Sequence, residues 1–74
     1  MKPSTILSDN IQTYRVNKDM SQKDLAKKSG LSQVMISVIE RKKHSPSLRS
    51  MELLSKAMRS TVVKLLTPNI FDRR

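Results

Sequence analysis

The stretch from Ser21 to Glu40, SQKDLAKKSGLSQVMISVIE, constrains the fold of this chain more than any other feature. Ser21 can cap a helix that begins at the next residue, and Asp24, three residues later, completes a capping box. Gly30, the only glycine of the 74 residues, stands where this helix must end, because glycine adopts the left-handed conformation at the least cost. Ser32 can then cap a second helix. The stretch therefore predicts two short helices joined by one tight turn.

The second of these helices is predicted to have an inner and an outer side. Ile36 and Ile39 fall three apart and are expected to face the first helix. A rotation of about 100° per residue then turns to the outer side Val34, Ser37, Val38 and Arg41, with Gln33 at the exposed start. Apolar side chains on an exposed side need a partner, which could be the thymine methyl groups of a DNA groove or another protein.

Charge limits the classes of partner. Lys and Arg number 15 against 6 acidic residues, which gives a formal net charge of +9 and a pI of about 10.5. Such a balance favours an anionic partner, with nucleic acid first and a ribosomal or membrane-surface role as alternatives. The chain has no cysteine, so disulfides and thiolate metal sites are excluded and a cytoplasmic location is expected.

Other function classes are disfavoured. No segment approaches the roughly 18 consecutive apolar residues that a membrane span requires. One histidine, scattered carboxylates and a single glycine supply no catalytic constellation, no metal site and no cofactor loop. We therefore expect neither an enzyme nor a membrane protein.

The rest of the chain is predicted to add three more helices to one all-α domain. Residues 1–7 are expected to form an N-terminal arm, and a helix should run from a cap at Ser8 to about Lys18. Pro46 closes a basic loop, and Ser47 can cap a fourth helix. A short fifth helix should begin at Ser60 or Thr61. The domain then spans residues 8–66, and a tail occupies residues 67–74.

Several short pieces in this order resemble the lambda-repressor/Cro-like (XRE-type) helix-turn-helix DNA-binding family: MSQKDLA, SGLSQ, ISVIERKK, PSL and LLSKAM. The resemblance covers about Leu7 to Leu66. It implies a compact five-helix domain with the third helix in the major groove, and a sequence-specific regulator of transcription of the phage, plasmid or restriction-modification controller type. The family often has glycine where this chain has Lys42 and Arg59, which leaves the shape of both turns open.

The resemblance and the chemistry of the side chains together suggest roles for individual residues. Gln33 can pair with adenine through its side-by-side donor and acceptor, and the two valines can contact thymine methyl groups. The predicted base contacts are Gln33, Val34, Ser37 and Val38. The predicted DNA backbone contacts are Gln22, Lys23, Arg41, Lys42, Lys43, His44 and Ser47. Arg15 and Glu40 match an ion pair of the family that bridges the first and third helices.

The working form is expected to be a homodimer on a palindromic operator of double-stranded DNA, because one helix reads only about four or five base pairs. The predicted dimer surface consists of Val63, Leu66, Ile70 and Phe71, unless the tail folds back on its own domain. RNA polymerase is a further candidate partner. The alternatives in function are a protein-interaction module and an antitoxin that use the same fold.

Overall fold

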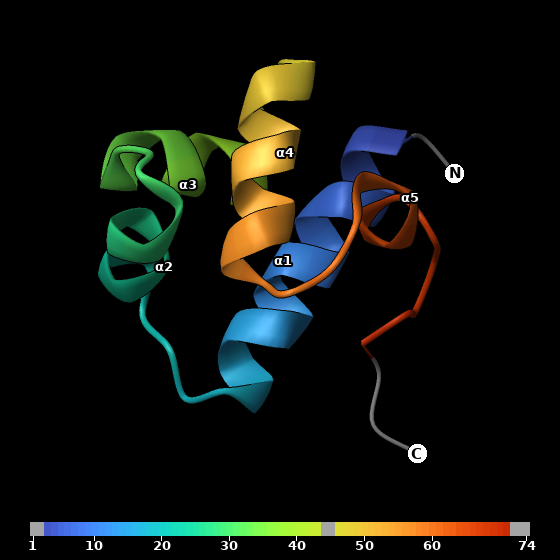
Figure 1. Cartoon of the computed structure of the whole chain (residues 1–74), viewed down its shortest axis with the longest axis horizontal. Helices are drawn as coiled ribbons and strands as arrows, with labels where there is room; N and C mark the ends of the chain where they lie inside the picture. Colours follow the sequence, from blue (N-terminus) through green and yellow to red (C-terminus); the bar gives the residue numbers. More distant parts are fainter. Residues whose placement is uncertain (1–2, 44–45, 72–74) are drawn as a thin grey trace.

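A computed structural model describes residues 3–43 and 46–71, which contain five helices and no strand. The helices are α1 (Pro3–Asn17), α2 (Gln22–Ser29), α3 (Gln33–Glu40), α4 (Leu48–Ala57) and α5 (Val62–Leu65). Figure 1 shows α4 across the front of the molecule, with α2 and α3 on one side of it and α5 on the other. Helix α1 packs against both α3 and α5. The predicted all-α, five-helix fold is confirmed.

Local signals fixed most helix ends as predicted. Ser21 and Asp24 form a complete capping box, in which each side chain accepts a hydrogen bond from the other residue's backbone N–H at 3.0 Å. Gly30 ends α2 in the left-handed conformation, with φ at 79°. The later helices begin after the N-caps Ser32, Ser47 and Thr61.

The predicted start of the first helix was wrong. Helix α1 begins at Pro3, so residues 3–7 of the predicted arm are helical and Ser8 is not a cap. Proline is favoured in a first helical turn, and the longer helix brings Leu7, which is 1% exposed, onto the same side as Ile11. Ser8 is fully buried, and its hydroxyl donates to the backbone oxygen of Glu40 at 2.7 Å.

The core takes side chains from all five helices. It consists of Leu7, Ile11, Tyr14, Leu25, Ala26, Ile36, Ile39, Leu54, Met58 and Leu65. Both isoleucines of α3 are therefore buried, as their spacing predicted. Within the described part of the chain, no helix is long and apolar enough to cross a membrane.

Four described residues other than glycine have a positive φ, namely Asp19, Lys42, Arg59 and Asn69. Lys42 has a φ of 62° and Arg59 a φ of 52°, at the two positions where the family pattern often has glycine. In both turns a backbone N–H reaches back five residues, from Lys43 to Val38 at 3.0 Å and from Ser60 to Ser55 at 2.8 Å. This is the closing bond of a Schellman motif, so the turns keep the form that glycine favours.

Candidate nucleic-acid interface

Helix α3 and the start of α2 enclose a shallow groove of about 260 Å³. It is lined by Gln22, Gln33, Val34, Ser37 and Arg41. Five residues that were singled out from the sequence therefore come together on one surface. The groove combines two amides, a hydroxyl, a guanidinium and an apolar side chain, which suits recognition of a mixed polar and apolar edge.

The four predicted base contacts differ in their accessibility. Gln33 and Val34 lie exposed at the start of α3, and the side chain of Val34 is 72% exposed. Ser37 is half-buried within the groove. Val38 is also half-buried, and the residues that line the groove do not include it. The accessible part of the predicted base-contact surface is therefore centred on the first turn of α3.

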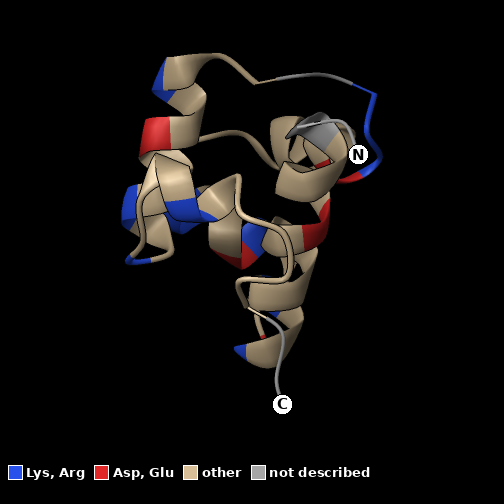
Figure 2. Cartoon of the chain, turned by 90° about the vertical axis from the view of Figure 1, so that its right-hand side faces the viewer, with Lys and Arg blue, Asp and Glu red and all other residues tan. Residues whose placement is uncertain are grey.

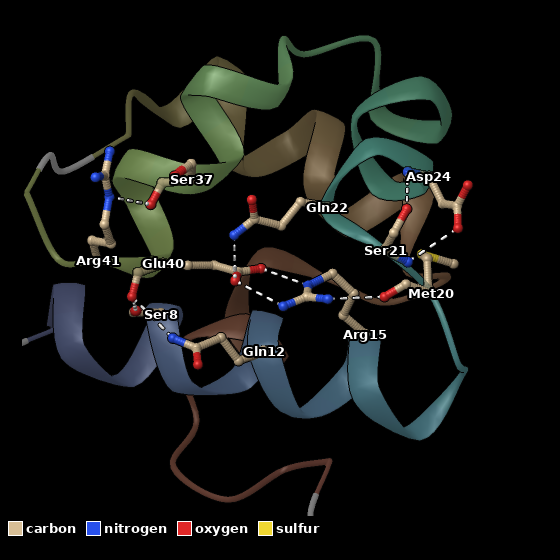
Figure 3. Close-up of polar contacts among 10 residues, drawn as sticks. All are labelled: Ser8, Gln12, Arg15, Met20, Ser21, Gln22, Asp24, Ser37, Glu40 and Arg41. Atoms are coloured by element: carbon tan, nitrogen blue, oxygen red, sulfur yellow. Dashed lines mark hydrogen bonds and ion pairs between the residues drawn. The ribbon is translucent and has the colours of Figure 1, made fainter.

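The position of α3 is fixed by polar contacts that converge on its last residue, Glu40 (Figure 3). Its carboxylate accepts hydrogen bonds from Arg15 Nε at 2.9 Å and Nη2 at 3.0 Å, and from Gln22 Nε2 at 3.1 Å. Its backbone oxygen accepts from Ser8 Oγ at 2.7 Å and from Gln12 Nε2 at 2.9 Å. The geometry confirms the contact between Arg15 and Glu40 and extends it into a network that joins α1, α2 and α3.

Of the predicted DNA backbone contacts, Gln22 and Arg41 line this groove. Lys23, Arg41 and Lys43 are exposed, and Figure 2 shows a continuous basic stretch in the segment directly after α3. The guanidinium of Arg41 folds back so that its Nε donates to Ser37 O at 3.4 Å. His44 lies outside the described residues. The phosphate contacts predicted for Lys23, Arg41, Lys43 and His44 stay predictions.

Besides Arg41, three more predicted phosphate ligands have partners within the chain. Gln22 donates to Glu40, as described above. The Lys42 ammonium lies 3.6 Å from a carboxylate oxygen of Asp9, and both side chains are about half exposed. Ser47 accepts the backbone N–H of Ser50 at 3.2 Å as the cap of α4.

The apolar residues predicted for a dimer surface divide into two pairs. Val63 is 76% exposed and Ile70 is 39% exposed. Leu66 and Phe71 are half-buried and pack against the core. The ring of Phe71 meets that of Tyr14 edge to face, with centroids 5.4 Å apart. The start of the tail therefore folds back on its own domain but leaves two apolar side chains outside.

Sequence reasoning missed the side chains of α1 that hold distant backbone oxygens, namely Ser8, Gln12, Asn10 and Asn17. Asn10 gave one usable signal, because asparagine is disfavoured inside a helix unless its amide has a specific partner. Among the described residues, no group of three or more His, Cys, Asp or Glu side chains is placed to hold a metal ion.

Comparisons with known proteins agree with this geometry. A family described as "Helix-turn-helix" matches residues 11–65. Control protein C.SmaI of Serratia marcescens is 40% identical over 62 residues, which cover 84% of this chain and 74% of that protein.

Two solved structures share the fold. A hypothetical transcription factor from Neisseria, NHTF, has a TM-score of 0.85 at 33% identity and covers 90% of this chain and 77% of its own. The restriction-modification controller protein C.Esp1396I, solved as a tetramer in complex with its natural 35 base-pair operator, has a TM-score of 0.76 at 30% identity. That match covers 89% of this chain and 96% of the controller.

Proposed function

The chain belongs to the lambda-repressor-like helix-turn-helix family, and from this premise we propose that it regulates transcription by binding operator DNA through α3. Within that family, its similarity to C.SmaI and C.Esp1396I favours a controller of a restriction-modification system. The proposed site of action is the cytoplasm, and the proposal includes no catalytic activity.

The observation that carries this proposal is the groove at the start of α3. Gln33 offers one amide donor and one acceptor on an exposed helix end, the pattern that pairs with N6 and N7 of adenine. Val34 lies beside it with an exposed apolar surface that suits a thymine methyl group. Exposed Lys23, Arg41 and Lys43 supply positive charge for phosphates around the groove. The proposed target is therefore a half-site with an A·T pair opposite Gln33.

We further propose that two copies of the chain bind a palindromic operator. A single helix contacts too few base pairs for a useful specificity, and C.Esp1396I is a tetramer on its operator. Exposed Val63 and Ile70 are the proposed contact between the copies. Occupancy of a promoter by such a dimer would exclude RNA polymerase, which makes repression the expected outcome.

Selection of bound duplexes from a random pool tests this proposal. We expect a palindromic consensus with adenine or thymine at the positions that Gln33 and Val34 contact. A parallel selection with Gln33→Ala should lose preference at one position of each half-site and keep the rest. A wild-type pool without enrichment after repeated rounds would reject the proposal.

One observation favours a second function, because Val34 places an apolar side chain on the exposed side of α3 and a partner protein could cover it. The dependence of binding affinity on salt concentration distinguishes DNA binding from binding of a partner protein. Lys23, Arg41 and Lys43 give three phosphate contacts a copy and six a dimer, so DNA affinity should fall roughly a thousandfold between about 50 and 200 mM salt. A protein partner bound through Val34 should show little dependence on salt.

A further inference from the structure

Helix α1 carries two rows of polar side chains that hold two different parts of the molecule. The first row is Ser8, Gln12 and Arg15, which are spaced by four and three residues and so share one face of the helix. Figure 3 shows this row directed at Glu40, the last residue of α3. Glu40, at the end of the proposed recognition helix, is thus attached to α1 through both its carboxylate and its backbone oxygen.

The second row is Asn10 and Asn17, seven residues or about two turns apart. The amide of Asn10 donates to the backbone oxygens of Leu65 at 2.7 Å and Thr67 at 2.8 Å. The amide of Asn17 donates to the backbone oxygen of Phe71 at 2.8 Å. The end of α5 and the segment after it are thus attached to the same helix.

These amide contacts are specific in geometry. Asn10 is 2% exposed, so its amide depends on these two acceptors, and the carbonyl of Leu65 at the end of α5 lacks a partner within its own short helix. Between the two asparagines, the Tyr14 ring meets the Phe71 ring. Three points of attachment therefore fix both the position and the rotation of this segment on α1.

We propose that α1 sets the spacing between the two half-sites of the operator, with Asn10 and Asn17 as positioning residues. This inference rests on the proposed function, because it requires the dimer contact at Val63 and Ile70. That contact lies on α5 and the segment after it, which the asparagines hold at Leu65, Thr67 and Phe71, and the other row of α1 holds α3. Helix α1 thus transmits the geometry of the dimer to the two reading surfaces.

Because of the dimensions of the domain, a small rotation at the dimer contact moves α3 along the DNA by a distance comparable to one base pair. The shortest extent of the domain is 20 Å. With a lever of about that length, a rotation of about 10° at the dimer contact moves α3 by about 3.5 Å, which is close to the rise of one base pair. Loosening the segment on α1 should therefore admit spacings that differ by one base pair.

The test measures binding to duplexes that carry the same two half-sites at the best spacing and at one or two base pairs more or fewer. The variants are Asn17→Ala, Asn17→Asp, which keeps the shape but removes the donor, and Asn10→Ser combined with Asn17→Ala. Val16→Ala is the matched control, since Val16 is the neighbour of Asn17 and its side chain is 67% exposed. Circular dichroism establishes that each variant is folded, and Asn17→Ala decides the outcome if the double variant is not.

For the Asn17 variants we expect the ratio of the affinity at the best spacing to the affinity at neighbouring spacings to fall about threefold or more. The base preferences within each half-site should be unchanged. Val16→Ala should keep the wild-type profile. Folded Asn17 variants with the wild-type spacing profile would overturn the inference, and so would an equal loss of affinity at every spacing. A wild-type protein that selects no palindrome would instead reject the proposed function, and with it the premise of the inference.

Discussion

Replacing Glu40 with alanine tests whether the polar network at the end of α3 holds the domain together. The Glu40 side chain is 5% exposed and accepts three hydrogen bonds, two from Arg15 and one from Gln22. Alanine removes all three acceptor contacts. The Arg15 guanidinium, whose side chain is 19% exposed, then keeps its hydrogen bond to the backbone oxygen of Met20 at 3.0 Å but loses its counter-charge.

The expected loss is large compared with the stability of so small a domain. Removing one partner of a buried ion pair costs about 3–5 kcal/mol, because the other charge stays desolvated. A domain of this length is stable by about 4–11 kcal/mol. At about 4–8 °C for each kcal/mol, the midpoint of thermal unfolding should fall by roughly 12–40 °C. Glu40→Ala should therefore lose its fold before it changes the sequence that it binds.

A double variant separates the charge from the shape. In Arg15→Met combined with Glu40→Leu, both charges are absent and apolar side chains of similar volume replace them, a change that is often neutral or stabilising. The double variant should therefore be more stable than Glu40→Ala, although it has lost the same ion pair.

Urea unfolding followed by far-ultraviolet circular dichroism measures these differences, and thermal unfolding gives the midpoints. Thr13→Ala, a half-buried change elsewhere on α1, serves as the control. A Glu40→Ala variant whose free energy of unfolding lies within about 1 kcal/mol of the wild-type value would refute the reasoning. So small a loss would mean that the variant does not leave the charge of Arg15 desolvated and unpaired. A double variant less stable than Glu40→Ala would refute it as well.

Three further predictions concern the reading surface, a turn and a cap. Gln33→Ala should weaken operator binding by about 1–3 kcal/mol and relax one base position, whereas Lys43→Ala should weaken all sequences alike, as measured by competition binding. Arg59→Gly should raise the stability to urea by about 1 kcal/mol, because φ at this residue is 52° and glycine adopts that conformation without strain. The pKa of Asp24 is lowered, mainly because the Ser21 backbone N–H donates to its carboxylate. The ionised Asp24 therefore stabilises the fold fully above its ordinary pKa of 3.8, and this stabilisation is lost as the pH falls through the lowered folded-state pKa. Asp24→Asn should flatten this acid dependence in urea titrations.

What the sequence could predict was set by the range of the interactions. The caps at Ser21, Ser32, Ser47 and Thr61 depend on partners three residues away, so local pattern was sufficient to place four of the five helix starts. The cap predicted at Ser8 failed because α1 begins five residues earlier, at Pro3, and the Ser8 hydroxyl inside the helix donates to the backbone oxygen of Glu40, 32 residues further along the chain. The sequence alone does not distinguish a serine that caps a helix from a serine that lies inside one and bonds to a distant residue.

The same distinction applies to the candidate site. Four of the groove residues were predictable because Gln33, Val34, Ser37 and Arg41 lie at helical spacing along α3 and its C-cap, whereas Gln22 comes from the start of α2. Their surroundings were not, because the partner of Lys42 is Asp9 on α1 and the partners of Asn10 are backbone oxygens at the end of α5 and just after it. A backbone oxygen is present at every residue, so residue type alone cannot indicate which one an amide will meet.

Charge and geometry therefore contribute differently to operator recognition. The net charge of +9 attracts any duplex and carries no sequence information. In the proposed dimer, selectivity requires that Gln33 meet a base edge within hydrogen-bond distance on both half-sites at once, and that condition depends on where α3 lies relative to the second copy. The positions of α3 and of the segment after α5 both depend on α1, through uncharged donors such as Ser8 and Asn10 as well as through Arg15. Changes in salt should consequently alter how tightly the protein binds while leaving the preferred spacing of its half-sites unchanged.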